Sequence, residues 1–447
     1  MKVGFISLGC SKNLVDTEMM IGLFKNRKYE ITNDPKIADI ILINTCGFIE
    51  SAKVEAINTI LEMAKYKNSK KGHCKLLIVT GCLVERYKEE LEKELPEVDM
   101  FIKYSDYGEK NNQSRKTFEE MFKKIEENNT KLEEGLSFFN RVVTTGKNYA
   151  YVRIAEGCDN RCTYCAIPYI RGPFISRKIE DVVKETEDLV KDGKTEIILI
   201  AQDTSKYGID LYNEPKLATL LKELCKIKEL KRIRFLYTYP ETITDELIQV
   251  VKENDKVCKY FDIPIQHISD KVLKRMNRHS TGESIRHTIK KLREEIPNVI
   301  IRTTIMVGFP GETKEDFEEL YNFVKEEKFD KMGAFSYSKE DGTPAAKIKE
   351  QIHPMTKKSR YKKIMKLQQE VSKENEKKFI GKEIEVLVEG MTEDKQYFIG
   401  RSYMDVPDID GVTYIRNDNK KDEKIIGQYV KTKIIDTIDY DTICEFI

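Results

Sequence analysis

The order of apolar and polar positions in the first 105 residues follows the rhythm of an α/β domain. Nearly continuous Val/Ile/Leu runs alternate with segments whose apolar residues recur at helical spacing. The predicted strands are 2–8, 39–45 and 75–81, and the predicted helices are 16–25, 51–65 and 84–95. Strands of this kind are buried on both faces, so the pattern predicts a parallel sheet covered by helices, in a domain of residues 1–116.

A second α/β region follows a segment of different character. Residues 109–146 are highly charged and poor in β-branched residues, which predicts a surface helix or a linker, placed at 117–143. Residues 144–374 contain six further strand patterns, at 151–155, 196–201, 232–237, 260–264, 299–307 and 331–336. With helical patterns between them, they predict a partial (βα)6 barrel, which ends in a basic helical segment at 357–378.

The last segment, 377–447, alternates apolar and polar residues with the period of a β-strand, and its Gly and Asp-Gly turns predict a small antiparallel β-barrel. Residues 381–447 contain 9 Lys and Arg against 15 Asp and Glu, a net charge of −6. Asp405, Asp408 and Asp410 lie in one loop, and we expect them to contact a basic partner. For Asp410, which precedes Gly411, turn formation is an equal alternative.

Composition narrows the class of protein. A chain of 447 residues predicts two to four domains. Its net charge of +1 argues against a generally basic nucleic-acid binder, although it does not exclude a local basic patch. No apolar run approaches the roughly 18 residues of a membrane helix, and no secretory signal opens the chain. We therefore expect a cytoplasmic protein without a membrane partner.

The chain has ten cysteines, too few for a disulfide scaffold at this length. Cys158, Cys162 and Cys165 form a C-x3-C-x2-C motif directly after a predicted strand. A structural zinc site needs four ligands, and no fourth Cys or His lies nearby. A 4Fe–4S cluster held by three thiolates leaves one iron open to chelate S-adenosylmethionine, whose reductive cleavage generates a carbon radical. The motif therefore predicts such a cluster.

Cys10, Cys46 and Cys82 are 36 residues apart, and each lies just past the end of a predicted strand, beside Gly9, Gly47 and Gly81. Because the carboxyl ends of parallel strands share one edge of a sheet, we expect the three thiols to converge and to hold a second 4Fe–4S cluster. The alternative is three independent core cysteines. The remaining cysteines (Cys74, Cys225, Cys258 and Cys444) have no partner at ligand spacing.

Polar or glycine-rich signals also follow the barrel strands. Since the site of a βα barrel lies at the carboxyl ends of its strands, we expect these residues to contact S-adenosylmethionine. The candidates are Gln202, Gln266, His267 and Gly308.

The two triads, in this order, resemble those of the radical S-adenosylmethionine methylthiotransferases, over essentially the whole chain. SLGCSKNLVDTE around Cys10, INTCGFIESAKVEAI around Cys46 and VTGCLVERY around Cys82 look like the RimO type. RIAEGCDNRCTYCAIPYIRG fits both main branches of the family, and GRSYMDVPDIDGVTYI at 400–415 is similar to the RimO TRAM segment.

The resemblance implies a reaction in which a β C–H of an aspartate in the twelfth small-subunit ribosomal protein becomes C–SCH3. It implies two 4Fe–4S clusters and two molecules of S-adenosylmethionine: the barrel cluster cleaves one to the deoxyadenosyl radical, and the sulfur on the N-terminal cluster is methylated by the other. A sulfur donor and an electron donor are further partners.

Two alternatives stay open at this point. The same chemistry on tRNA beside the anticodon is disfavoured because the acidic C-terminal barrel suits a basic ribosomal protein better than phosphates. An iron–sulfur electron-transfer or assembly protein without a substrate radical does not explain the motif that opens the barrel.

Overall fold

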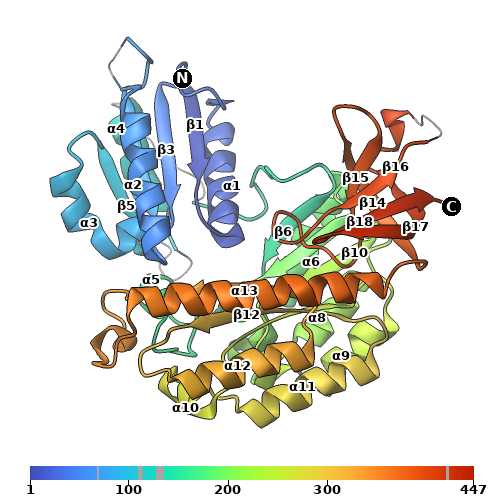
Figure 1. Ribbon diagram of the computed structural model, residues 1–447. Helices are drawn as coiled ribbons and strands as arrows, with labels where there is room; N and C mark the ends of the chain where they lie inside the picture. The colour runs from blue at the N-terminus through green and yellow to red at the C-terminus, as the bar shows by residue number, and fades with distance from the viewer. Residues whose placement is uncertain (68–69, 109–113, 127–134, 419–421) are drawn as a thin grey trace.

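The computed structural model describes residues 1–67, 70–108, 114–126, 135–418 and 422–447 (Figure 1). The first domain is built on a five-stranded parallel sheet in the order β2-β1-β3-β4-β5. Its elements are β1 (Lys2–Ser7), α1 (Ser11–Asn26), β2 (Glu30–Thr32), β3 (Ile40–Thr45), α2 (Glu50–Ala64), β4 (Leu76–Gly81), α3 (Cys82–Glu94) and β5 (Met100–Lys103). The three predicted strands form its centre, while the pattern missed the short edge strands β2 and β5.

The segment predicted as a linker, 117–143, begins inside a helix of the first domain. This helix, α4 (Ser114–Glu126), buries Phe118, Met121 and Phe122 against Phe24 in the domain core. The core therefore extends past the predicted boundary at residue 116. Residues 127–134 of the predicted linker lie outside the described part of the chain.

The central domain is a partial barrel of six strands with all pairings parallel. The sheets β10-β9-β6 and β11-β12-β13 meet where Thr238 N donates to Asp262 O at 2.9 Å. The strands are β6 (Tyr149–Arg153), β9 (Glu196–Ile200), β10 (Arg232–Phe235), β11 (Tyr260–Gln266), β12 (Ile300–Val307) and β13 (Lys331–Ser336), and a short hairpin, β7 (Ala155–Glu156) with β8 (Ile175–Ser176), follows β6. All six strands agree with the sequence prediction to within a few residues.

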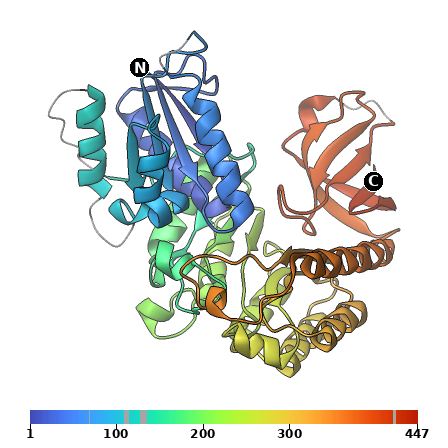
Figure 2. The same cartoon turned by 60° about the vertical axis from the view of Figure 1, so that its left-hand side comes forward.

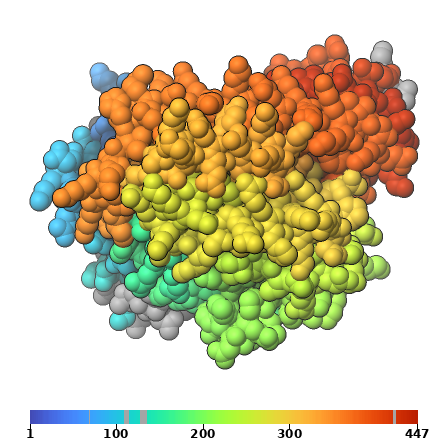
Figure 3. Space-filling model, turned by 60° about the horizontal axis from the view of Figure 1, so that its bottom comes forward, coloured from blue at the N-terminus to red at the C-terminus, as the bar shows by residue number. Residues whose placement is uncertain are grey.

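Helices cover the outer face of this barrel (Figure 1), the face that is turned toward the viewer in Figure 3. They are α6 (Ile179–Lys191), α7 (Ile209–Tyr212), α8 (Leu217–Cys225), α9 (Asp245–Glu253), α10 (Asp270–Arg275), α11 (Gly282–Glu295), α12 (Lys314–Glu327) and α13 (Pro354–Lys377), whereas the short α5 (Ile167–Ile170) contacts α3 of the first domain. Successive residues of each strand point to opposite faces of the barrel sheet. In β9, Ile197 and Leu199 pack in the core under the helices, whereas Ile198 and Ile200 pack toward the other two domains.

The C-terminal domain is a closed barrel in the order β14-β15-β16-β18-β17. Its strands are β14 (Glu383–Met391), β15 (Tyr397–Arg401), β16 (Thr413–Arg416), β17 (Tyr429–Ile438) and β18 (Asp441–Phe446). Four of the five pairings are antiparallel, as predicted, and the closing pair β16–β18 is parallel. This barrel and the N-terminal domain both lie on the inner side of the central barrel (Figures 1 and 2).

The prediction that Asp405 and Asp410 contact an external partner is wrong, because both are buried where the C-terminal barrel meets the central barrel. Asp405 pairs with Lys331 at 3.2 Å, and Asp410 accepts a 2.7 Å hydrogen bond from the Tyr260 hydroxyl. Burial raises the pKa of Asp410. Only Asp408 is exposed. No helix in the described ranges is long and apolar enough to cross a membrane.

Candidate active site

The three N-terminal cysteines come together at one edge of the first sheet. Cys10 caps α1 after β1, Cys46 follows β3, and Cys82 opens α3 directly after β4, and these strands are neighbours in the sheet. Burial, together with the charges of Cys10 and Cys46 nearby, raises the pKa of the Cys82 thiol to about 12, although the guanidinium of Arg171 acts to lower it. The expected convergence of these thiols is what the topology produces.

Glycines make this convergence possible. Gly9 has φ +88°, and a Cβ on it would lie 2.6 Å from Cys46 Cβ and 2.9 Å from Cys46 Sγ. Gly47 is equally confined, since its Cβ would lie 2.7 Å from Leu83 Cα at the start of α3. Any side chain at either position would push the loops that carry the thiols apart.

The barrel cysteines lie on the loop that follows β7. Cys158 N donates to Gly172 O at 3.1 Å, and Cys165 N donates to Cys162 O at 3.0 Å, which closes the loop into a tight turn. Burial, followed by the charges of Cys162 and Cys158, raises the pKa of Cys165. Gly157 has φ +76°, and its Cβ would lie 2.0 Å from Pro173 O, so only glycine fits before Cys158.

The donor chemistry of both triads fits an iron–sulfur cluster better than a single ion. Among the residues that the structure describes, no three His, Cys, Asp or Glu side chains converge tightly enough to hold one metal ion. A four-iron cluster distributes its thiolates over separate irons, so its ligands stand around a larger body. Each triad presents three thiols.

A buried charge network lies beside Cys82 and links the first domain to the two ends of the loop that carries the barrel cysteines. Arg171, at the end of α5, pairs with Asp16 of α1 at 2.7 Å and with Glu156 of β7 at 3.3 Å, and Arg153 pairs with the same two carboxylates. All four side chains are at most 4% exposed. The guanidinium of Arg171 also lies 3.6 Å from Cys82 Sγ. Burial alone would raise the pKa of Glu156, but the positive charges of Arg171 and Arg153 hold it below its usual range.

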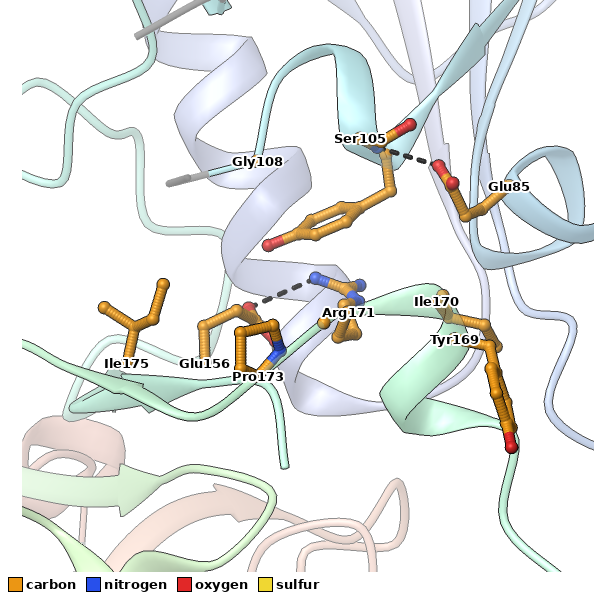
Figure 4. A pocket seen from close by; sticks show the side chains of 11 residues that line it. Glu85, Ser105, Gly108, Glu156, Tyr169, Ile170, Arg171, Pro173 and Ile175 are labelled. Atoms are coloured by element: carbon orange, nitrogen blue, oxygen red, sulfur yellow. Dashed lines mark hydrogen bonds and ion pairs between the residues drawn. The ribbon is translucent and has the colours of Figure 1, made fainter. Parts of the chain in front are cut away.

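A cavity of about 150 Å³ opens beside this network, between the first domain and the loop after the barrel cysteines (Figure 4). Glu85 and Ser105 line it from the first domain, and Tyr169, Arg171 and Pro173 line it from the barrel. The side chains of Arg171 and Glu156 point toward one another at its inner end (Figure 4).

The structure places the four residues predicted to contact S-adenosylmethionine in different settings. Gln202 donates to buried Glu156, and its own carbonyl oxygen is buried with no hydrogen-bond partner among the described residues. Gln266 has φ +69° at an irregular end of β11. These two lie at strand ends, at the mouth of the barrel, in positions that suit ligand contact.

His267 and Gly308 are instead engaged with the protein. His267 is fully buried, its Nδ1 accepts from Ser269 N at 3.0 Å, and burial lowers its pKa to about 3. The backbone N–H of Gly308 donates to Glu312 at 2.6 Å, so this donor is already occupied. His267 thus organises the turn after β11, although its Nε2 is buried without a hydrogen-bond partner among the described residues, and Gly308 organises the loop after β12.

Comparison with known proteins gives three family matches in the order of the three domains. The descriptions are Uncharacterized protein family UPF0004 for residues 2–103, Radical SAM superfamily for 152–324 and TRAM domain for 380–447. The ribosomal protein uS12 methylthiotransferase RimO of Alkaliphilus oremlandii is 60% identical over 99% of this chain and 98% of its own length. Its counterpart in Acetivibrio thermocellus is 49% identical over 100% of this chain and 98% of its own length.

This chain belongs to the RimO family. It is a radical S-adenosylmethionine methylthiotransferase, and its cofactors are S-adenosylmethionine and 4Fe–4S clusters. Among solved structures, the radical S-adenosylmethionine methyltransferase TsrM from Kitasatospora setae, with cobalamin and a 4Fe–4S cluster bound, has a TM-score of 0.56 at 14% identity and covers 77% of this chain and 76% of its own. That likeness shows the shared fold alone.

The RimO-family chain also has site residues that sequence reasoning missed. The sequence motifs around the cysteines include four of them, Asp16, Arg153, Glu156 and Arg171. Charged residues near cysteines have no distinctive spacing of their own, so the motifs did not reveal them. Their placement between two domains depends on tertiary contacts, which no local pattern reports.

A second set of missed residues clamps the N-terminal domain to the barrel. Glu340, on the loop after β13 and 2% exposed, pairs with Arg86 of α3 at 3.0 Å and with Lys53 of α2 at 3.3 Å. Arg86 also donates to Gly47 O at 2.6 Å, directly beside Cys46. This clamp ties the loop of one triad to the rim of the barrel that holds the other.

Proposed function

We propose that this enzyme methylthiolates the β-carbon of an aspartate in the small-subunit ribosomal protein uS12. The full-length identity of 60% to a curated RimO carries this proposal. The tRNA alternative is disfavoured, since the near relatives act, by their names, on a ribosomal protein and the C-terminal barrel has a net charge of −6. A cytoplasmic location follows from such a substrate.

We further propose that Cys158, Cys162 and Cys165 hold the cluster that binds S-adenosylmethionine, with Gln202 and Gln266 as contacts. Cys10, Cys46 and Cys82 hold the second cluster. Bound together, the cofactors supply a deoxyadenosyl radical for hydrogen abstraction and a methylated sulfur for transfer. A sulfur donor and an electron donor are required, because the product gains a sulfur atom and reductive cleavage of a sulfonium consumes an electron.

The residues of the chain contribute position and enclosure. The first turn of α1 enters the barrel mouth, where Lys12 Nζ lies 3.7 Å from the centre of the Tyr237 ring and donates to Ala201 O at 3.3 Å. Cys82, Cys158 and Cys162 are less than 8% exposed. Burial of these three thiols and of the network around Arg171 keeps water away from a reactive carbon radical.

The proposed function is tested by mass spectrometry of uS12 from cells with and without this gene. We expect the protein from intact cells to carry one SCH3 in place of one hydrogen on a single aspartate, and the protein from deleted cells to lack it. The same uS12 mass in both strains, together with a changed mass of a tRNA adenosine, would overturn the proposal.

We predict that Glu340→Gln uncouples the two half-reactions. The buried amide no longer attracts Arg86 and Lys53, so the N-terminal thiols shift relative to the barrel. Misplacement on the ångström scale costs roughly ten- to a hundredfold in a transfer step. The ratio of methylthiolated product to deoxyadenosine should fall by about that factor.

Iron content and substrate-free deoxyadenosine formation should not change in this variant, since Glu340 contacts no cysteine. Asp341→Asn is the matched control, because Arg86 binds the backbone carbonyl of Asp341, which the substitution retains. If both variants keep the parental product ratio, the clamp does not position the triads.

A further inference from the structure

Helix α13 has an unusual distribution of charge. Between 354 and 366 it contains six Lys and Arg, and its first acidic residue is Glu370. Three of the six are directed to the protein: Lys357 donates to Tyr337 O at 2.9 Å, Arg360 pairs with Glu312, and Lys363 lies over aromatic rings of α12. The other three need a different explanation.

These three, Lys358, Lys362 and Lys366, form a lysine stripe. They are spaced by four residues, so they lie on one face of the helix, and all are exposed. Within the described chain, no acidic side chain lies within ion-pair distance of any of them, whereas Lys373, farther along α13, pairs with Asp439 at 2.9 Å. The stripe is therefore a row of uncompensated positive charge.

The helix that carries the stripe begins beside the mouth of the central barrel. Helix α13 packs along the edge strand β13, and its first turns lie beside the mouth, where a Cβ on Gly308 would be 2.5 Å from Lys357 Cγ. Its last turns reach β17 of the C-terminal barrel. Figure 1 shows the helix, in orange, running from below the N-terminal domain to that barrel, and the orange atoms of this part of the chain lie on the surface in Figure 3.

We propose that the lysine stripe binds the phosphate backbone of RNA around the substrate protein in the small ribosomal subunit. This rests on the proposed function, since the RNA in question is the RNA that surrounds the ribosomal substrate protein. Evenly spaced ammonium groups suit a phosphate backbone, because each lysine acts as a point charge that attracts a phosphate. This attraction does not depend on contacts with the bases. The enzyme would then act on the assembled subunit.

The alternative occupant, a protein surface, fits the stripe less well. Lysine is depleted in the cores of protein interfaces, and the exposed apolar residues of α13 are Met355 and Tyr361, both near its start. A ribosomal protein that binds RNA is itself basic, so it would be repelled by the stripe and attracted to the C-terminal barrel with its charge of −6. The positive lysine stripe would therefore contact RNA, and the acidic C-terminal barrel would contact the basic protein.

The first test measures binding of a fluorescein-labelled RNA hairpin by the reconstituted full chain over a salt series. We expect the triple variant Lys358→Glu, Lys362→Glu, Lys366→Glu to bind at least tenfold more weakly at low salt. The slope of log K against log salt should flatten by about 2–3, as expected for three lost phosphate contacts. The triple Lys→Arg variant should retain binding.

The second test compares methylthiolation of assembled small subunits and of isolated uS12. The triple Glu variant should lose at least fivefold in rate on subunits and keep its rate on the isolated protein. The matched control reverses Lys226, Lys228 and Lys231, exposed lysines before β10 at the other end of the barrel, and should behave as the parent.

Unchanged RNA affinity and salt slope in the triple Glu variant would overturn the proposal. Equal loss on both substrates would also overturn it, because the stripe would then contact protein. If the parent chain modifies neither substrate, the proposed function fails, and the hairpin measurement still decides whether the stripe binds RNA.

Discussion

Replacing Cys158, Cys162 and Cys165 together with alanine is expected to abolish deoxyadenosine formation. The substitution removes the thiols proposed to hold the cluster that chelates and reduces S-adenosylmethionine, so no electron reaches the sulfonium. Iron content after anaerobic reconstitution should fall from about eight atoms to about four per chain, since each triad is proposed to hold four irons. Both quantities are measured on one preparation, by chromatography of reduced reactions and by iron analysis.

The companion variant replaces Cys10, Cys46 and Cys82. It should also lose about half of its iron, but it should still form deoxyadenosine and give no methylthiolated protein. The control is Cys225→Ala, a half-buried thiol of α8 remote from both triads. Full iron in the N-terminal triple variant would contradict a cluster at that site, and equal loss of deoxyadenosine in both triple variants would contradict divided roles.

The second large effect is expected from Arg171→Met. In the parent, two buried arginines face two buried carboxylates, Asp16 and Glu156, so the network is neutral. Without Arg171 one negative charge is left buried and uncompensated, which costs about 3–5 kcal/mol. We expect chemical denaturation to show a loss of this size in the free energy that holds the first domain on the barrel.

Two measurements distinguish the loss of charge compensation from the loss of packing in Arg171→Met: the effect of a second substitution and the dependence of stability on pH. Asp16→Asn added to Arg171→Met restores neutrality and should recover part of the loss, as a double-mutant cycle would show. In the parent the pKa of Glu156 is lowered, so its contribution to stability is present above the unfolded pKa and is lost as pH falls through the folded one.

In Arg171→Met the dependence of stability on pH is expected to have the opposite sign. The buried carboxylate now favours its proton, which raises its pKa, so the variant should lose stability as pH rises above about 4.5 and should differ least from the parent at acid pH. A loss of stability that does not depend on pH would point to packing around Tyr104, over whose ring the guanidinium lies at 4.0 Å, as the main contribution of Arg171.

For the acidic loop of the C-terminal barrel, the charge count was correct, but the predicted contact of Asp405 and Asp410 with an external partner was wrong. The excess of 15 acidic over 9 basic residues is a property of composition. Yet Asp405 and Asp410 are used internally, because Lys331, Arg302 and Tyr260 come from strands of another domain and meet them at the interface. Nothing in the loop itself distinguishes a carboxylate that faces a domain from one that faces water.

His267 and Gly308 illustrate the same limit within one domain. Their place at strand ends was predictable, because the period of apolar residues locates each strand and the barrel rule locates its functional end. Which groups are free to bind was not, since Ser269 N occupies Nδ1 of His267 and Glu312 occupies the backbone N–H of Gly308. Local pattern gives position along the chain, and hydrogen-bond satisfaction depends on neighbours that the fold supplies.

The sequence by itself determined the three domains, the six central strands and the two cysteine triads, because periodicity, strand ends and ligand spacing are local properties of the chain. Even the meeting of Cys10, Cys46 and Cys82 follows from sequence, since parallel strands end at a common edge. Only the tertiary structure decided that Arg171 and Glu340 join the domains and that Asp405 is buried while Lys358 is exposed. Those outcomes depend on which charged groups lose their water when separate domains pack, and desolvation is a property of the assembled fold.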